Sequence, residues 1–136
     1  MAINFNKLEE ITRALKSSKQ TGKSFHTTFA FRGNKLLSIG INNYNKHHPS
    51  HKFGKYKPTK GSGIYVPGIH SEVSALIKLG LEDCSDITFV NFRINNNGTL
   101  ANSKPCLNCK RVLEQVGYKK IWYFDGSKFL INNTLE

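Results

Sequence analysis

The sequence contains no apolar run long enough to cross a membrane. Its longest apolar stretches, such as Phe29–Phe31 and Ile121–Phe124, span only a few residues, whereas a membrane-spanning helix needs roughly 20. The first ten residues include acidic side chains and lack the apolar centre of a secretory signal. We therefore expect no membrane association and no signal peptide, and we place the protein in the cytoplasm.

Acidic residues are scarce as well. The chain has nine Asp and Glu against twenty Lys and Arg, which gives a net charge of +11. Residues 11–71 hold eleven of the basic side chains and none of the acidic ones, so the whole excess lies in that stretch. Such a field favours phosphate-bearing ligands, either a nucleotide or a nucleic-acid backbone. Its alternative role is to keep the surface soluble.

Cysteine is too rare for a disulfide framework, since the chain has only three. Cys106 and Cys109 lie three positions apart, a spacing that in an intracellular protein indicates metal binding or redox chemistry more often than a structural disulfide. Cys84 is left over, and we interpret it as a partly buried thiol.

The 136 residues fit one domain. Strands that alternate with short helices predict an α/β fold with helices covering a sheet and at least one parallel pair of strands. A long basic loop is expected over residues 42–68 and a short C-terminal extension over 125–136. The predicted helices cover residues 6–18, Ser71 to Gly80 and Pro105 to Gly117, and the predicted strands are Phe25–Arg32, Leu36–Ile41, Ile87–Ile94 and Ile121–Phe124.

Two short motifs stand at the starts of the two later helices. These are His70-Ser71-Glu72 and Pro105-Cys106-Leu107-Asn108-Cys109. If the two helices pack side by side, their N-termini present one imidazole and two thiols to a common point, and helix N-termini favour the thiolate form. Nitrogen and sulfur ligands suit Zn²⁺, and three protein ligands leave a fourth position for water, as in a catalytic site.

Glu72 follows the histidine by two positions and can reach that water without binding the metal. Water activated by zinc still needs a group that moves protons between it and the substrate. We therefore assign the metal to His70, Cys106 and Cys109, with one Zn²⁺ per chain, and the catalytic proton transfer to Glu72.

Other interpretations of the cysteine pair remain open at this point. A redox pair is expected on the first helix after a strand in a thioredoxin-like order, which the predicted elements lack. A closed structural zinc site needs a fourth ligand, which His47, His48 or His51 in the long loop could supply.

The two motifs together resemble those of zinc-dependent nucleobase deaminases. From about Phe25 to Phe124 the chain is similar to the cytidine and deoxycytidylate deaminase superfamily, and Pro105–Tyr123 is most similar to the deoxycytidylate deaminases carried by bacteriophages. The resemblance implies a three-layer α/β/α sandwich around a mixed sheet of about five strands, a homo-oligomer, and the host cytoplasm in the case of a viral protein. It also implies a substrate contact from Asn42, and we place Ser71, where the family usually has alanine, in the same pocket.

Three functions compete. The leading one is zinc-dependent deamination of a cytosine nucleotide, dCMP to dUMP with release of ammonia, in which the basic loop 42–68 binds the phosphate. The second is deamination of a base in single-stranded nucleic acid or tRNA, which the net charge of +11 favours. The third is a zinc-containing module that binds nucleic acid without turnover, and the presence of Glu72 speaks against it.

Overall fold

A computed structural model describes residues 3–19, 24–42, 70–80 and 83–132 of the protein. Most of the predicted loop 42–68 lies outside the described residues, together with His47, His48 and His51. None of the helices in the described ranges has the length and apolar content of a membrane span.

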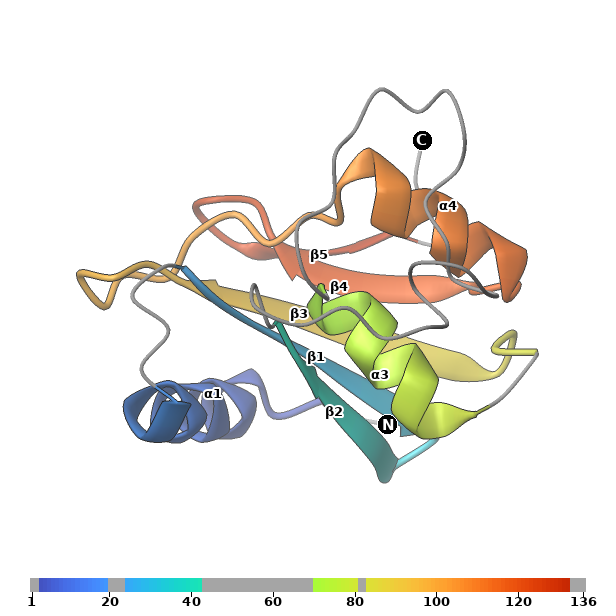
Figure 1. Cartoon of the computed structure of the whole chain (residues 1–136), viewed down its shortest axis with the longest axis horizontal. Coiled ribbons are helices and arrows are strands. Elements are labelled where there is room, and N and C mark those ends of the chain that lie inside the picture. The colour runs from blue at the N-terminus through green and yellow to red at the C-terminus, as the bar shows by residue number, and fades with distance from the viewer. Residues whose placement is uncertain (1–2, 20–23, 43–69, 81–82, 133–136) are drawn as a thin grey trace.

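The described elements alternate largely as predicted (Figure 1). The strands form one sheet in the order β2-β1-β3-β4-β5, in which β3 and β4 are parallel and every other neighbouring pair is antiparallel. This confirms the α/β fold with a mixed sheet of five strands. The elements are α1 Phe5–Lys19, β1 Phe25–Arg32, β2 Lys35–Ile41, α3 Ser71–Leu79, β3 Ile87–Ile94, α4 Leu107–Gln115, β4 Lys120–Phe124 and β5 Phe129–Asn132.

The fifth strand lies in the segment that we interpreted as a C-terminal extension. β5 pairs with β4 in antiparallel register, with Phe124 opposite Phe129. The Asp125 carboxylate accepts hydrogen bonds from the backbone N–H groups of Ser127 and Lys128 and so shapes the turn between the two strands. Sequence patterning did not single out this strand because four residues are too few to establish a period.

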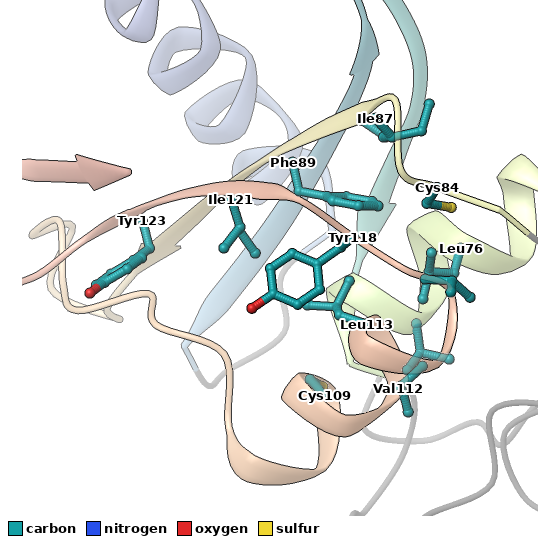
Figure 2. Close-up of a cluster of buried hydrophobic side chains, with 13 residues drawn as sticks. Leu76, Cys84, Ile87, Phe89, Cys109, Val112, Leu113, Tyr118, Ile121 and Tyr123 are labelled. Carbon is teal, nitrogen blue, oxygen red and sulfur yellow. The ribbon is translucent and has the colours of Figure 1, made fainter. Parts of the chain in front are cut away.

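Apolar side chains fill a layer on each face of the sheet. On one face Leu8 of α1 packs with Phe29, Val90 and Phe92. On the other face α3 and α4 cover a second cluster that includes Phe89 and Ile121 from the sheet (Figure 2). Because successive residues of a strand point to opposite faces, β1 and β3 supply apolar side chains to both clusters.

On the face covered by α3 and α4, the paired strands β1 and β3 change character along their length. Three pairs of facing residues follow one another from the core towards the end of the strands, two positions apart and therefore about 6.8 Å from one pair to the next. The first pair is apolar, the second is neutral and polar, and the third joins an imidazole to a guanidinium. These pairs are Ala30 with Phe89, Thr28 with Asn91 and His26 with Arg93.

The N-terminal part of α3 lies directly on β2 at Gly40. A Cβ atom at this position would stand 2.1 Å from the backbone oxygen of Ser71 and 2.4 Å from the backbone nitrogen of Ala75. No side chain fits there without moving the helix. Gly40 therefore sets how closely the first turn of α3, with its functional residues, approaches the sheet.

Candidate functional site

His70, Cys106 and Cys109 converge at the N-termini of two helices. His70 is the N-cap residue of α3 and Cys106 that of α4, and both have extended backbone torsions. The Nδ1 atom of His70 lies 3.3 Å from Cys109 Sγ and 3.6 Å from Cys106 Sγ. The three ligand atoms lie within 4.8 Å of one another, so one metal ion can reach all three.

The spacing of these atoms fits zinc. In a tetrahedron with Zn–N of about 2.05 Å and Zn–S of about 2.3 Å, nitrogen and sulfur ligands stand about 3.6 Å apart. The two His70–cysteine distances are close to that value. In the described part of the chain the group of candidate ligands has three members, which suits a site with one open position.

The two thiols differ in their surroundings. Hydrogen bonds from Cys109 and His70 lower the pKa of Cys106 to about 4. The pKa of the fully buried Cys109 is raised by its hydrogen bond with Cys106 and by burial. The bond to Cys106 in turn raises the pKa of His70. Without a metal, the thiolate is therefore on Cys106, and Cys109 keeps a proton that metal binding must displace.

Glu72 lies in the first turn of α3 and is buried, with 6% of its surface exposed. Its carboxylate accepts a hydrogen bond from Asn91 Nδ2 at Oε2 (3.0 Å) and one from Ser71 Oγ at Oε1 (3.2 Å). Burial raises the pKa of Glu72. A carboxyl that is both oriented and shifted towards neutrality is suited to accepting and releasing a proton.

Asn91 is the residue of the site that sequence reasoning missed. Its two amide protons are both used, one on Glu72 and one on the backbone oxygen of Ser103 (3.2 Å). Its Oδ1 accepts from the Thr28 hydroxyl (2.7 Å), which also lies 2.9 Å from Ser71 Oγ. The side chains of Thr28, Ser71, Glu72 and Asn91 thus form a closed ring of hydrogen bonds. The sequence offers one indication, a single amide in the middle of a largely apolar strand.

A cavity of about 180 Å³ opens beside these residues. Asn42 and Ser71, the predicted substrate contacts, both line it. The Asn42 side chain is buried and already bonds at both ends, since Oδ1 accepts from the His26 N–H (2.9 Å) and Nδ2 donates to the Ser24 carbonyl (3.1 Å). One further amide proton and one lone pair remain for a ligand. The cavity is lined by His26, Asn42, His70, Ser71, Glu72, Arg93, Asn102, Ser103, Lys104 and Cys106.

The basic residues of the described pocket wall come from outside the stretch in which the sequence concentrates its charge. Arg93 is the next-to-last residue of β3, and Lys104 stands just before the Pro105–Cys109 motif. Burial and the neighbouring Arg93 lower the pKa of His26 to about 4, so this imidazole is neutral at physiological pH. Cys84 is buried and lies outside the metal-ligand group.

The sequence matches no protein-family model and no curated protein. The structure does resemble solved ones. It is similar to the crystal structure of cytidine deaminase from Burkholderia pseudomallei with a TM-score of 0.55 and 11% sequence identity, over 96% of this chain and 93% of that chain. At this identity the likeness establishes a shared fold, and the chemistry has to be inferred from the residues of the site.

Proposed function

We propose that the protein is a zinc-dependent hydrolytic deaminase of a cytosine nucleotide, converting dCMP to dUMP and ammonia. The observation that carries the proposal is the convergence of a His/Cys/Cys ligand group and a buried, oriented carboxyl on one cavity. A redox pair or a structural knuckle would need no carboxyl held by two side chains at this position. The fold shared with a cytidine deaminase agrees with the proposal.

Zinc held by His70, Cys106 and Cys109 would supply Lewis-acid activation of a water molecule. The fold positions the ligands themselves. Cys106 Sγ caps α4 by accepting a hydrogen bond from the Cys109 N–H (3.5 Å), and Cys109 is fully buried. Attachment to two helix starts restrains the ligand atoms, which is what a site of fixed geometry requires.

Glu72 carries the proton. In hydrolytic deamination water adds to C4 of the cytosine ring, the C4–N4 bond breaks, and the water oxygen remains as the carbonyl of uracil. Glu72 would accept one proton from the water and pass it to the ring nitrogen, and would then transfer the remaining proton, from the hydroxyl on C4, to the amino group that leaves as ammonia. Asn91 and Ser71 each hold one carboxylate oxygen, so the carboxyl keeps its orientation through this cycle.

Asn42 and Ser71 are the proposed substrate contacts. Asn42 has spare hydrogen-bonding capacity at the cavity wall, and Ser71, a member of the hydrogen-bonded ring, also lines the cavity. Ser71 is positioned by the close packing of α3 on β2, and Asn42 by its hydrogen bonds to His26 and Ser24. Amide and hydroxyl groups of this kind fix the orientation of a base or sugar by hydrogen bonds.

The proposal is tested with purified, zinc-loaded protein and a panel of nucleosides and monophosphates, with ammonia release as the measurement. We expect turnover of dCMP. Glu72→Gln, which keeps the size of the side chain, should lower kcat by about 10²–10⁴-fold. The same variant should keep one zinc per chain. Full activity in this variant, or a wild-type protein that turns over no cytosine compound, would refute the proposal.

A second candidate is deamination of a cytosine in single-stranded nucleic acid. The net charge of +11 favours it, because contacts to a phosphate backbone are made by Lys and Arg. Its discriminating property is steep salt dependence of binding to single strands. Turnover of an oligonucleotide in preference to dCMP would replace the first candidate with this one.

A further inference from the structure

We infer that Arg93 binds the terminal phosphate of the substrate in a second subsite of the cavity. The inference rests on the proposed function and extends it, since it names a residue that makes the enzyme specific for a nucleotide over a nucleoside. It assigns the phosphate contact to a residue of the sheet and not to the predicted loop 42–68, most of which lies outside the described residues.

The guanidinium of Arg93 is held in place but incompletely satisfied. Nη2 donates to Ser24 Oγ (3.3 Å), and the Ser24 hydroxyl in turn donates to Asn95 Oδ1 (3.2 Å). The Nε–H is buried and has no hydrogen-bond partner among the described residues. A buried donor without an acceptor is costly, and native proteins rarely tolerate one unless a ligand or water supplies the acceptor.

Arg93 also has no carboxylate partner within the described ranges. The ion pairs found there join Arg13 to Glu9 and Arg32 to Asp86, both on the protein surface. A partly buried guanidinium normally pairs with a carboxylate, because removing the charge from water is unfavourable. An anionic ligand would supply the negative charge that no described carboxylate places beside Arg93.

Arg93 is positioned to bind a group of the substrate that the sugar separates from the base. On the pleated face of β3 it stands two residues beyond Asn91, so the two Cα atoms are about 6.8 Å apart. Asn91 holds Glu72 at the reacting end of the cavity, whereas Arg93 and the exposed Lys104 line the cavity wall. In a nucleotide the sugar separates base and phosphate in the same way.

Phosphate is the anion that matches this donor set. A guanidinium offers parallel N–H donors to two oxygens of one phosphate, and a phosphomonoester carries nearly two negative charges at neutral pH. His26, which faces Arg93 across the strand pair, is uncharged and so does not add a second cation. Lys104 provides a further positive charge at the rim of the cavity.

The test compares dCMP with deoxycytidine in the zinc-loaded wild type and in Arg93→Met, which removes the donors but keeps an unbranched side chain. We expect kcat/KM for dCMP to fall about 10–100-fold, as for the loss of charged hydrogen bonds. For deoxycytidine the change should stay within about threefold. Arg93→Lys should recover only part of the loss, because an ammonium lacks the planar fork.

Arg32→Met is the matched control, since it removes one arginine from the far end of the same pair of strands, next to the exposed Asp86. It should leave both substrates unaffected. Equal losses for dCMP and deoxycytidine in Arg93→Met would overturn the inference. So would preferential turnover of a trinucleotide with no terminal phosphate, because an internal phosphodiester would then be the ligand.

Binding of inorganic phosphate, measured by calorimetry on the zinc-loaded protein, tests the subsite without turnover. We expect Arg93→Met to weaken this binding at least tenfold and Arg32→Met to leave it unchanged. This measurement separates the two proposals: a protein that binds phosphate through Arg93 but deaminates nothing keeps the subsite and refutes the proposed function. Phosphate affinity that is the same in Arg93→Met and wild type overturns the subsite.

Discussion

Asn91 donates a hydrogen bond of 3.0 Å to Glu72 and so ties the middle of β3 to the first turn of α3. Replacing it with alanine should lower kcat about 10–100-fold with little change in KM, because the carboxyl remains but loses its orientation. Steady-state kinetics and zinc analysis check this. An equal rise in KM, or loss of zinc, would show a merely structural role.

The Asn91→Asp variant gives an independent measure of the same contact. It places a second carboxyl about 3 Å from Glu72, and two such groups cannot both ionise readily. The pKa of the pair rises, so the acid side of the pH–rate profile should move to higher pH by about one unit. An unchanged pH–rate profile would mean that Asn91 does not contact Glu72 during turnover.

Gly40 should tolerate no side chain. In Gly40→Ala the new methyl group meets backbone atoms of α3, which cannot rotate away, so α3 must shift. We expect a loss of about 1–3 kcal/mol of stability in denaturant unfolding, together with weaker zinc binding. Gly33→Ala is the control, because its φ of +59° strains the backbone but no atom lies within 4 Å of the added Cβ. It should reduce stability and leave zinc affinity intact.

His26 makes stability fall in mild acid. Its pKa in the folded protein is about 4, below the ordinary 6.5, so between these values the unfolded chain binds a proton that the folded protein does not. The stabilisation present above pH 6.5 is therefore lost as the pH falls to about 4, by up to about 3 kcal/mol. Urea unfolding of His26→Gln should show a shallower decline over this range. Parallel curves for the two proteins would contradict the buried neutral imidazole.

Metal binding should release protons. At neutral pH Cys109 holds a proton and the raised pKa of His70 leaves it partly protonated, and both must give up the proton to bind zinc. Calorimetry in buffers of different ionisation enthalpy should give between about one and two protons per zinc, with affinity rising with pH. Cys109→Ser should lose tight binding and Cys84→Ser should keep it. Zinc uptake without proton release would be inconsistent with these protonation states.

Much of the fold was predictable because local patterns and tertiary packing agree. The bounds of β1 and β3 were predicted to the residue, and Gly80 ends α3 in the left-handed conformation expected of a helix stop. The start of α4 differs slightly from the prediction, since Pro105 was expected to open the helix, which begins at Leu107 after the N-cap residue Cys106. The three candidate ligands come together because both motifs begin helices on the same face of the sheet.

The rest of the site could not be predicted from the sequence, because it depends on which face of β3 is covered by helices. Asn91 and Arg93 alternate with Val90 and Phe92, a pattern that by itself predicts solvent-facing polar residues. Their face is instead covered by α3 and α4, and this follows only from the path that the chain takes before and after β3. The sequence located positive charge in residues 11–71, but a count of charges cannot show which single arginine lacks a counterion.

The facing residue pairs of β1 and β3 differ in their contacts according to their position along the strands. Thr28 and Asn91 belong to the hydrogen-bonded ring that orients the Glu72 carboxyl, and His26 and Arg93 lie two positions farther along the strands, at the cavity wall. In the proposed enzyme, substitutions at His26 and Arg93 could therefore change the compound that is accepted, while Thr28 and Asn91 continue to support the same reaction.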